Sequence, residues 1–220
     1  MIFLFPNCSN ISFIRTTTFI FFRWKKSNFL LVNNIRKKIK MNNFTLLKRA
    51  FYTRHKLIYT SLEEIVKAIR YGDMILYDKE YRNYTLKQAI EHIRKQPENE
   101  MQYWKARLLP AVAYNGTFSE IDSTHLISYS NVTAMDFDHI GTQAEMTDLR
   151  NWLIRTPCVL CVFVTPGGRG LKALILHDNT DPDRHRDLYT QLLDKFNVAG
   201  KDSACKDMAR RNYLSYDPDI

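Results

Sequence analysis

Cysteine, glycine, proline and long apolar runs are all scarce in this sequence. Four Cys in 220 residues are too few for a disulfide scaffold, and seven Gly with seven Pro exclude a collagen-like or Gly/Pro-rich disordered chain. No apolar run reaches the length of about 20 residues that a membrane-spanning helix needs. The composition, 45% hydrophobic and 25% charged, is that of a soluble globular protein of ordinary domain size. We therefore expect a protein without a membrane partner.

Acidic residues are absent from the N-terminal part of the chain. The first is Glu63, and residues 1–62 carry 12 Lys/Arg, so this part contributes +12. Residues 63–220 carry 20 Lys/Arg and 23 Asp/Glu, and contribute −3 to the net charge of +9. The body of the protein is slightly acidic, so the basic net charge is no evidence that this body binds a phosphate backbone.

Residues 1–40 are rich in Phe, Ile, Asn and Lys and lack the layout of a signal peptide. We interpret them as a non-native or disordered basic extension. Three origins remain open: upstream sequence translated ahead of a true start at Met41, a disordered basic arm, or an organelle-targeting segment.

Three capping boxes mark helix starts in the rest of the chain, at 61–64, 85–88 and 142–145. The first two predict a helical N-terminal segment at 41–99. In residues 100–220, apolar and β-branched runs alternate with helical patterns, and we expect residues 111–118 to form a tight hairpin. This order of elements indicates an α+β fold with a small, mostly antiparallel sheet packed by helices. The main predicted elements are strands at 132–138, 159–165, 171–176 and 211–215 and helices at 97–108, 142–155 and 182–196.

Asp136 and Asp138 stand two residues apart at the end of a predicted strand. Residues i and i+2 of a strand point to the same face, about 7 Å apart at Cα. Two carboxylates there repel each other unless a cation lies between them, and Mg²⁺ or Mn²⁺ prefers oxygen ligands. Paired ions of this kind are the usual arrangement for nucleotidyl transfer. The pattern predicts a metal site, or else an exposed strand end at which one Asp caps the next turn.

Three glycines in four positions follow the next predicted strand, in the sequence TPGGRGLK at 165–172. Such a loop lets the backbone approach a ligand closely and presents N–H groups to an anion. Arg169 and Lys172 add positive charge for phosphate oxygens. The loop is not a Walker loop, because the Gly-Lys-[Ser/Thr] ending is missing and a strand should follow. It is either a phosphate-binding loop or an ordinary hairpin loop.

The region near the C-terminus adds Asp202 and Asp207 as further carboxylates. Arg210 or Arg211 could contact an anion there. An arginine that leads into an apolar strand can equally pair with a nearby acid.

The cysteines carry little functional signal. Cys158 and Cys161 lie in a predicted strand, where residues i and i+3 face opposite sides, so a shared metal or disulfide is not expected. We interpret all four Cys as reduced thiols of a cytoplasmic protein. His177 ends the strand after the glycine loop, and either faces the same site or is inert.

Taken in order, these features resemble the VirE N-terminal-like family. They are an Asp-x-Asp strand, a Gly-rich loop ending in Gly-Leu-Lys, and an Asp followed by Arg and LSYDP. Lys105, Leu-Pro-Ala at 109–111 and Gly116-x-Phe118 are similar to the family's lead-in. The resemblance covers roughly 100–218. That family lies at the N-terminus of primase-like replication proteins on mobile elements of Bacteroides-type bacteria, and is thought to belong to the archaeo-eukaryotic primase (primase-polymerase) superfamily.

The resemblance implies a primase-polymerase-like domain with an RRM-like catalytic core at 100–220. Asp136 and Asp138 would be the catalytic, metal-binding carboxylates of the first motif, and Asp202 would complete the metal site from the third. The nucleotide would be bound by the glycine loop, the strand after it and the basic residue beyond the third motif: Gly168, Arg169, Gly170, Lys172 and Arg210.

The sequence departs from the family pattern at one loop position, at one position in the strand that follows, and at the end of the chain. Lys172 stands where many relatives carry His, and Gly167 where the family favours Ser. The chain ends at Ile220, whereas relatives usually continue into a helicase-like or other C-terminal region. The resemblance therefore implies a truncated chain that works with a helicase-like region or a partner chain.

The implied activity is attack of a 3′-hydroxyl on the α-phosphate of an NTP or dNTP, with Mg²⁺ or Mn²⁺, on single-stranded DNA during replication. One alternative is a non-catalytic single-stranded DNA-binding or recruitment module. It would use the basic residues of 41–62 with the interleaved Phe44, Phe51, Tyr52 and Tyr59. Another is a metal-dependent glycosyltransferase or cyclase that uses Asp-x-Asp on a nucleotide.

Overall fold

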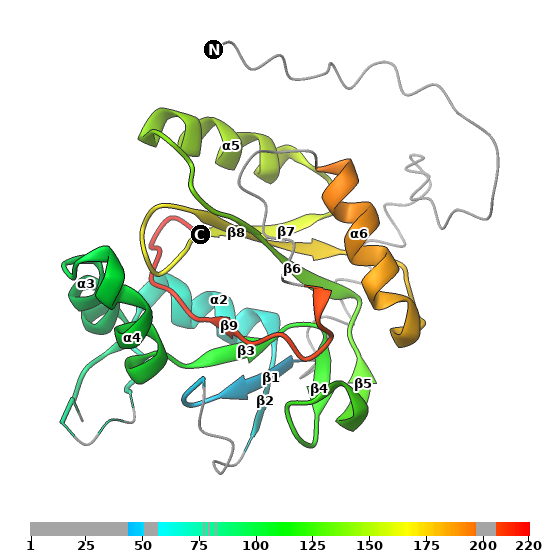
Figure 1. The fold of residues 1–220 in the computed structure, drawn as a ribbon, viewed down its shortest axis with the longest axis horizontal. Coiled ribbons are helices and arrows are strands. Elements are labelled where there is room, and N and C mark those ends of the chain that lie inside the picture. Colours follow the sequence, from blue (N-terminus) through cyan, green and yellow to red (C-terminus); the bar gives the residue numbers. More distant parts are fainter. Residues whose placement is uncertain (1–43, 51–56, 77, 79, 82, 197–205) are drawn as a thin grey trace.

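The computed structural model describes residues 44–50, 57–76, 78, 80–81, 83–196 and 206–220. The N-terminal extension predicted at 1–40 lies outside the described residues, as does Asp202. Within these ranges the predicted α+β fold is confirmed, and all strand pairs are antiparallel (Figure 1).

The central sheet consists of three strands in the order β6-β8-β7. Their bounds are Val132–Phe137 (β6), Leu171–Leu176 (β8) and Val159–Val164 (β7). The glycine loop joins β7 to β8, and Asp136 of β6 lies directly opposite Lys172 of β8. The predicted strands of this region are therefore confirmed.

A second sheet has the order β2-β1-β3-β9, and a separate two-stranded sheet pairs β4 with β5. These six strands are Phe44–Leu47 (β1), Ile58–Thr60 (β2), Ala111–Ala113 (β3), Gly116–Phe118 (β4), Leu126–Tyr129 (β5) and Asn212–Tyr213 (β9). The sequence did not predict β1 and β2. The tight hairpin predicted at 111–118 is wrong, because both edges of β3 are taken, by β1 and by β9, and β4 pairs with β5 instead.

Five α-helices surround the sheets within the described residues: Leu62–Tyr71 (α2), Leu86–Arg94 (α3), Glu98–Leu108 (α4), Gln143–Arg155 (α5) and His185–Lys195 (α6). The three predicted capping boxes are present at the starts of α2, α3 and α5. The last predicted helix begins later than expected, since a 3₁₀ turn at Pro182–Arg184 precedes α6. None of the helices that the structure describes has both the length and the apolar character to cross a membrane.

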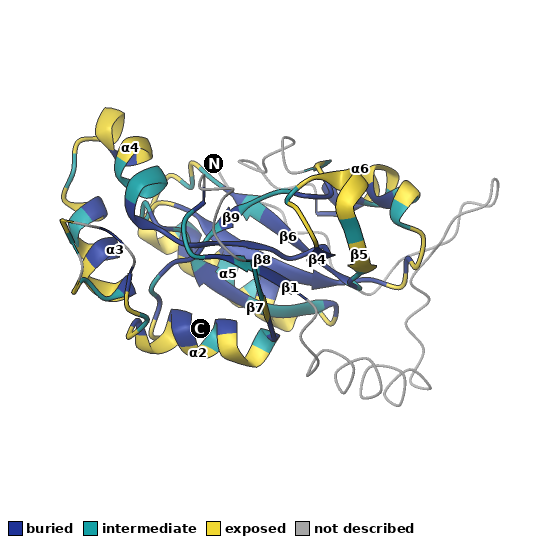
Figure 2. Ribbon diagram, turned by 90° about the horizontal axis from the view of Figure 1, so that it is seen from below, coloured by how far each residue is buried: buried dark blue, intermediate teal, exposed yellow. Residues whose placement is uncertain are grey.

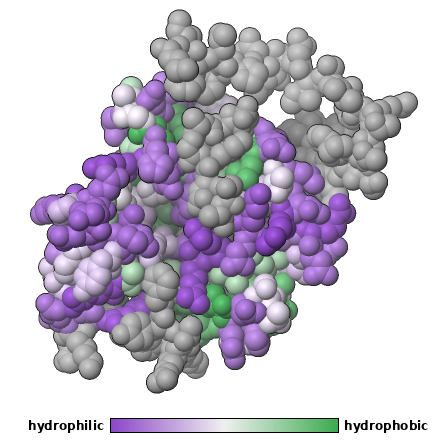
Figure 3. Space-filling model, viewed as in Figure 1, coloured by the Kyte–Doolittle hydropathy of each residue, from purple (hydrophilic) through white to green (hydrophobic). Residues whose placement is uncertain are grey.

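The two faces of the central sheet belong to different cores. Met135 and Phe137 of β6 pack with α5 and α6 on one side. Val132 and Ala134, which alternate with them, face the second sheet and helices α2, α3 and α4. The strands between these layers are largely buried (Figure 2), and the face seen in Figure 3 is mainly hydrophilic. Because side chains alternate along a strand, Asp136 continues the face that looks toward the second sheet.

Phe44 belongs to this inner layer. Its side chain is fully buried and makes an edge contact with Tyr114, at 5.7 Å between ring centroids. The interpretation of Phe44 as an exposed stacking residue is therefore wrong, since β1 places it between the sheets. Tyr59 is 44% exposed, whereas Phe51 and Tyr52 lie outside the described residues.

Candidate functional site

A buried ion pair between Asp136 and Lys172 lies at the centre of the candidate site. The two residues face each other across β6 and β8, and Lys172 is only 4% exposed. The Lys172 ammonium also donates a hydrogen bond to Oδ1 of Asn212, at 2.8 Å. A charged amine can be buried in this way because a carboxylate and an amide oxygen replace its water.

Asn212 joins this ion pair to the second sheet. It lies on β9, and its amide nitrogen donates to the backbone oxygens of Val112 at 3.3 Å and Arg210 at 3.1 Å. The sequence did not single out Asn212. The sequence feature that could have pointed to Asn212 is a polar residue inside a short apolar strand. Only the three-dimensional structure, in which β9 pairs with β3, shows that the Asn212 side chain reaches Lys172.

Asp138 follows β6 and lies against the glycine loop. A Cβ added to Gly170 would be 2.7 Å from Oδ1 of Asp138 and 2.7 Å from the backbone oxygen of Phe137. The close approach therefore requires glycine at this position. The structure thus brings together four of the predicted site residues, Asp136, Asp138, Gly170 and Lys172.

The glycine loop is a short hairpin connection with its own hydrogen bonds. Thr165 donates its N–H to the Gly170 oxygen, and Gly168 donates its N–H to the Thr165 oxygen, both at 2.9 Å. Gly168 has a φ of +79°, which glycine adopts without strain. The loop therefore joins two antiparallel strands, and the expectation that a strand follows it is confirmed.

Three cationic side chains lie at the loop, two from neighbouring helices and one from the loop itself. Arg94 of α3 donates to the backbone oxygens of Pro166 at 3.3 Å and Thr165 at 3.4 Å. Arg169 pairs with Glu98 of α4 at 3.0 Å, and both side chains are largely exposed. The Lys105 ammonium lies 3.5 Å from the position of a Cβ on Gly167.

The third predicted motif is only partly described. Arg210 precedes β9, and its N–H donates to the backbone oxygen of Asp207 at 3.1 Å. Its backbone oxygen accepts from Asn212, which connects it to the ion pair. Arg211 is directed elsewhere, since its guanidinium donates to the backbone oxygen of Ala50 at 3.0 Å.

The donor set at Asp136 and Asp138 is suited to a magnesium-type ion. Among the residues that the structure describes, no three His, Cys, Asp or Glu side chains gather into a metal site. Mg²⁺ does not need such a set, because it keeps several waters and is bound by one or two carboxylates together with substrate phosphates. Two carboxylates beside a glycine loop fit Mg²⁺ or Mn²⁺ of this kind.

Tyr114 is a second polar group that the sequence did not point to. Its hydroxyl is buried and has no hydrogen-bond partner among the described residues. Burial raises the pKa of Tyr114 well above its usual value, and Cys161 and the Asp136 carboxylate act in the same direction. The phenol therefore stays protonated near the Asp136 carboxylate.

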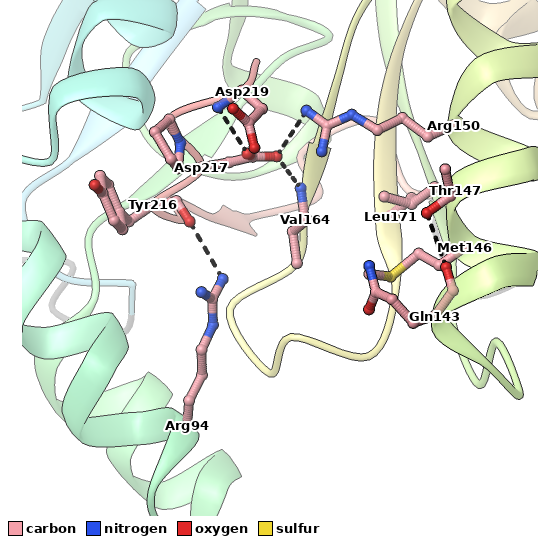
Figure 4. Close-up of a pocket in the computed structure, with 11 residues that line it drawn as sticks. Arg94, Gln143, Met146, Thr147, Arg150, Val164, Leu171, Tyr216, Asp217 and Asp219 are labelled. Atoms are coloured by element: carbon pink, nitrogen blue, oxygen red, sulfur yellow. Dashed lines mark hydrogen bonds and ion pairs between the residues drawn. The ribbon is translucent and has the colours of Figure 1, made fainter.

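A cleft of about 430 Å³ lies at the edge of the central sheet, between α5, α3 and residues 216–219 (Figure 4). The Asp217 carboxylate accepts the Val164 N–H at 2.8 Å and pairs with Arg150 at 3.1 Å. Asp217, the acid of the LSYDP sequence, thus covers an edge N–H of β7 and anchors the C-terminal segment. Leu171 also lines the cleft, and its side chain lies on the face of β8 opposite to Lys172.

His177 lies away from the candidate site. It follows β8 at the end opposite to the glycine loop, about 17 Å from Lys172 at 3.3 Å per residue. The possibility that it faces the same site is therefore wrong. Its ring is fully buried near Tyr129 and His185, and the Asn179 backbone is the polar group beside it.

We expect the variant Gly170→Ala to lower the free energy of unfolding by about 1–3 kcal/mol, because its Cβ would meet Asp138 and the Phe137 oxygen at 2.7 Å. Gly167→Ala is the matched control, since its Cβ would have ordinary contacts of 3.5 Å and longer. Urea denaturation of both variants measures the difference. Equal midpoints for the two variants would show that the loop and Asp138 do not touch.

Comparison with known proteins gives a single finding. A family model described as the BT4734-like N-terminal domain matches residues 104–220. No curated protein and no solved structure matches the chain. The match covers just over half of the chain and includes Asp136, Asp138, the glycine loop and Asn212. The chain therefore belongs to the BT4734-like N-terminal domain family.

Proposed function

We propose that this chain is a metal-dependent nucleotidyltransferase domain of the primase-polymerase type, related to the VirE N-terminal-like proteins of bacterial mobile elements. One observation carries the proposal. Two carboxylates, a buried lysine and a glycine loop meet on adjacent strands of one sheet, although they are separated along the chain. A fold gains little from such a polar cluster in an apolar layer, so a role in binding is the better explanation.

In this proposal Asp136 and Asp138 hold Mg²⁺ or Mn²⁺, and Asp202 supplies a third carboxylate. The ion, when bound, would activate the 3′-hydroxyl of the primer and neutralise charge on the leaving pyrophosphate. Glycine loop residues 168–170 and Lys172 would bind the phosphates of the incoming nucleotide. Arg210, whose backbone oxygen accepts from Asn212, would add positive charge.

Arg169 is available for this role even though it pairs with Glu98. Both side chains are largely exposed, and an exposed ion pair contributes only about 0–1 kcal/mol. A nucleotide phosphate can therefore take the guanidinium from Glu98 at little cost, and can form a charge-assisted, bidentate contact.

The partners in this proposal are nucleoside triphosphates and single-stranded DNA, together with a helicase-like region or partner chain. The biological process would be DNA replication of a mobile element in the bacterial cytoplasm.

One observation favours a second candidate, a non-catalytic single-stranded DNA-binding or recruitment module derived from such a primase. The Lys172 ammonium already neutralises Asp136, as it would in a site that has lost its metal. Of the aromatic residues considered for stacking, Tyr59 remains exposed, whereas Phe44 is buried.

We expect the full chain to incorporate labelled NTP or dNTP on single-stranded DNA, with or without a primer, when Mg²⁺ or Mn²⁺ is present. Asp138→Asn should reduce incorporation by roughly two orders of magnitude or more, as the loss of a charge-stabilising group does. Asp148→Asn, which removes an exposed carboxylate of α5, is the control and should stay active.

Each failure of this assay has a distinct meaning. Folded wild-type protein that incorporates nothing with either metal would contradict the enzymatic proposal. Binding of single-stranded DNA that persists in Asp136→Asn and Asp138→Asn would then support the second candidate. Incorporation that survives Asp138→Asn unchanged would place the chemistry elsewhere.

A further inference from the structure

The Lys172 ammonium occupies the place of a cation beside the Asp136 carboxylate. It is almost fully buried, and its contacts are the Asp136 ion pair and the hydrogen bond to Asn212. Lysine is a compact charge on a flexible four-carbon stem, so this ammonium can leave one anion for another without movement of the backbone.

The fold itself does not require a lysine at this position. The same face of β8 continues with Leu174 and Leu176, and Ala134 and Phe163 on the flanking strands are apolar as well. Apolar residues of similar volume commonly replace a buried ion pair at no cost to stability. The pair therefore needs an explanation beyond packing.

We propose that Lys172 is an internal counter-cation of the metal site. It neutralises Asp136 while no metal is bound, and moves to the phosphates of the nucleotide when a divalent cation takes the carboxylate. This inference rests on the proposed function, and makes Lys172 a positioning residue for the metal.

Electrostatics supports such an exchange. An ammonium and a divalent cation repel each other, so both do not share one carboxylate without a loss of affinity. The glycine loop ends directly before Leu171, so phosphates held at the loop would lie close to the Lys172 side chain. Divalent metal should therefore bind weakly on its own, and more tightly once the lysine charge is removed.

The test is a titration of the full chain with Mn²⁺ alone, in which electron paramagnetic resonance measures the free ion. Lys172→Met should bind Mn²⁺ about tenfold more tightly than wild type, because the competing charge is gone. Asp136→Asn/Lys172→Met should lose this gain. Lys105→Met is the control. It removes a positive charge beside Gly167, at the end of the loop farther along the chain from Lys172, and we expect a change of less than about twofold.

Equal or weaker Mn²⁺ binding by folded Lys172→Met than by wild type would overturn the inference and leave the proposed metal site standing. Absence of Mn²⁺ binding at Asp136 in every variant would overturn the metal site of the proposed function as well. The two failures are therefore distinguishable.

A measurement on wild-type protein avoids any dependence on the folding of the variant. A buried, hydrogen-bonded ammonium exchanges its protons slowly enough to be followed by ¹⁵N NMR. We expect the Lys172 ammonium resonance to shift or disappear as Mg²⁺ saturates the protein. A resonance that stays unchanged at saturating Mg²⁺ would overturn the exchange.

Discussion

Replacement of Asp136 by alanine should lower the free energy of unfolding by about 3 kcal/mol or more, because it leaves the Lys172 ammonium buried without a counter-charge. Lys172→Met should cost less. The carboxylate that it leaves behind has a 16% exposed side chain, against 5% for the lysine, so water can partly solvate it. Chemical denaturation of the full chain measures both effects, with Asp148→Ala as a surface control.

The double variant Asp136→Leu/Lys172→Met separates the interaction from the cost of burial. Apolar replacements remove both charges, so the double variant should come within about 1 kcal/mol of wild type, and the mutational cycle should show strong coupling. A loss below about 1 kcal/mol in Asp136→Ala would show that the lysine reaches solvent, and would contradict the buried geometry. The milder effect of Lys172→Met keeps that variant usable for the Mn²⁺ titration.

The features that the sequence predicted correctly are those set by local physics. A capping box needs residues only three positions apart, and all three predicted boxes are present. Alternation along a strand needs residues two positions apart, which is why the sequence pointed to Asp136 together with Asp138, whereas Lys172 was singled out by the glycine loop before it. Opposite placement of these two residues followed from the pairing of β6 with β8, which sequence alone did not supply.

The features that the sequence missed depend on pairing over long distances in the chain. β1 at residues 44–47 adds to β3 at residues 111–113, and no local pattern marks a four-residue strand as part of that sheet. The same pairing buries Phe44 and prevents the hairpin expected at 111–118. Asn212 lies 40 residues beyond Lys172, so its contribution to the site appears only in three dimensions.

Stability should fall steeply between pH 6.5 and about 4, because two histidines are buried in the neutral form. Burial lowers the pKa of His177 to about 3, and the neighbouring His185 is a smaller cause in the same direction. Burial also lowers the pKa of His185 to about 4, although the negative charge of Asp207 acts in the opposite direction. Both start from an ordinary value of 6.5. In this window the unfolded chain binds protons that the folded chain does not, so stability is present at neutral pH and is lost as the pH falls.

The expected size of this loss is about 2 kcal/mol per histidine at pH 5, or about 4 kcal/mol for the pair. Denaturation at pH 7.5, 6 and 5 measures it. Carboxylates add little between pH 7.5 and 5. The lowered pKa values of Glu64 and Asp78 start from 4.5 and 3.8, so their contributions are lost only at lower pH.

His177→Phe should remove about half of the pH dependence between pH 7.5 and 5. No hydrogen bond of ordinary geometry reaches the His177 ring within the described residues, so phenylalanine keeps a buried ring and gives up only a weak contact with the Asn179 backbone. His139→Asn is the matched control. It removes an exposed histidine at a φ of 57°, a conformation that asparagine tolerates, and should retain the full slope. A slope that His177→Phe leaves unchanged would mean that the ring takes up its proton in the folded state, and that water reaches this end of β8.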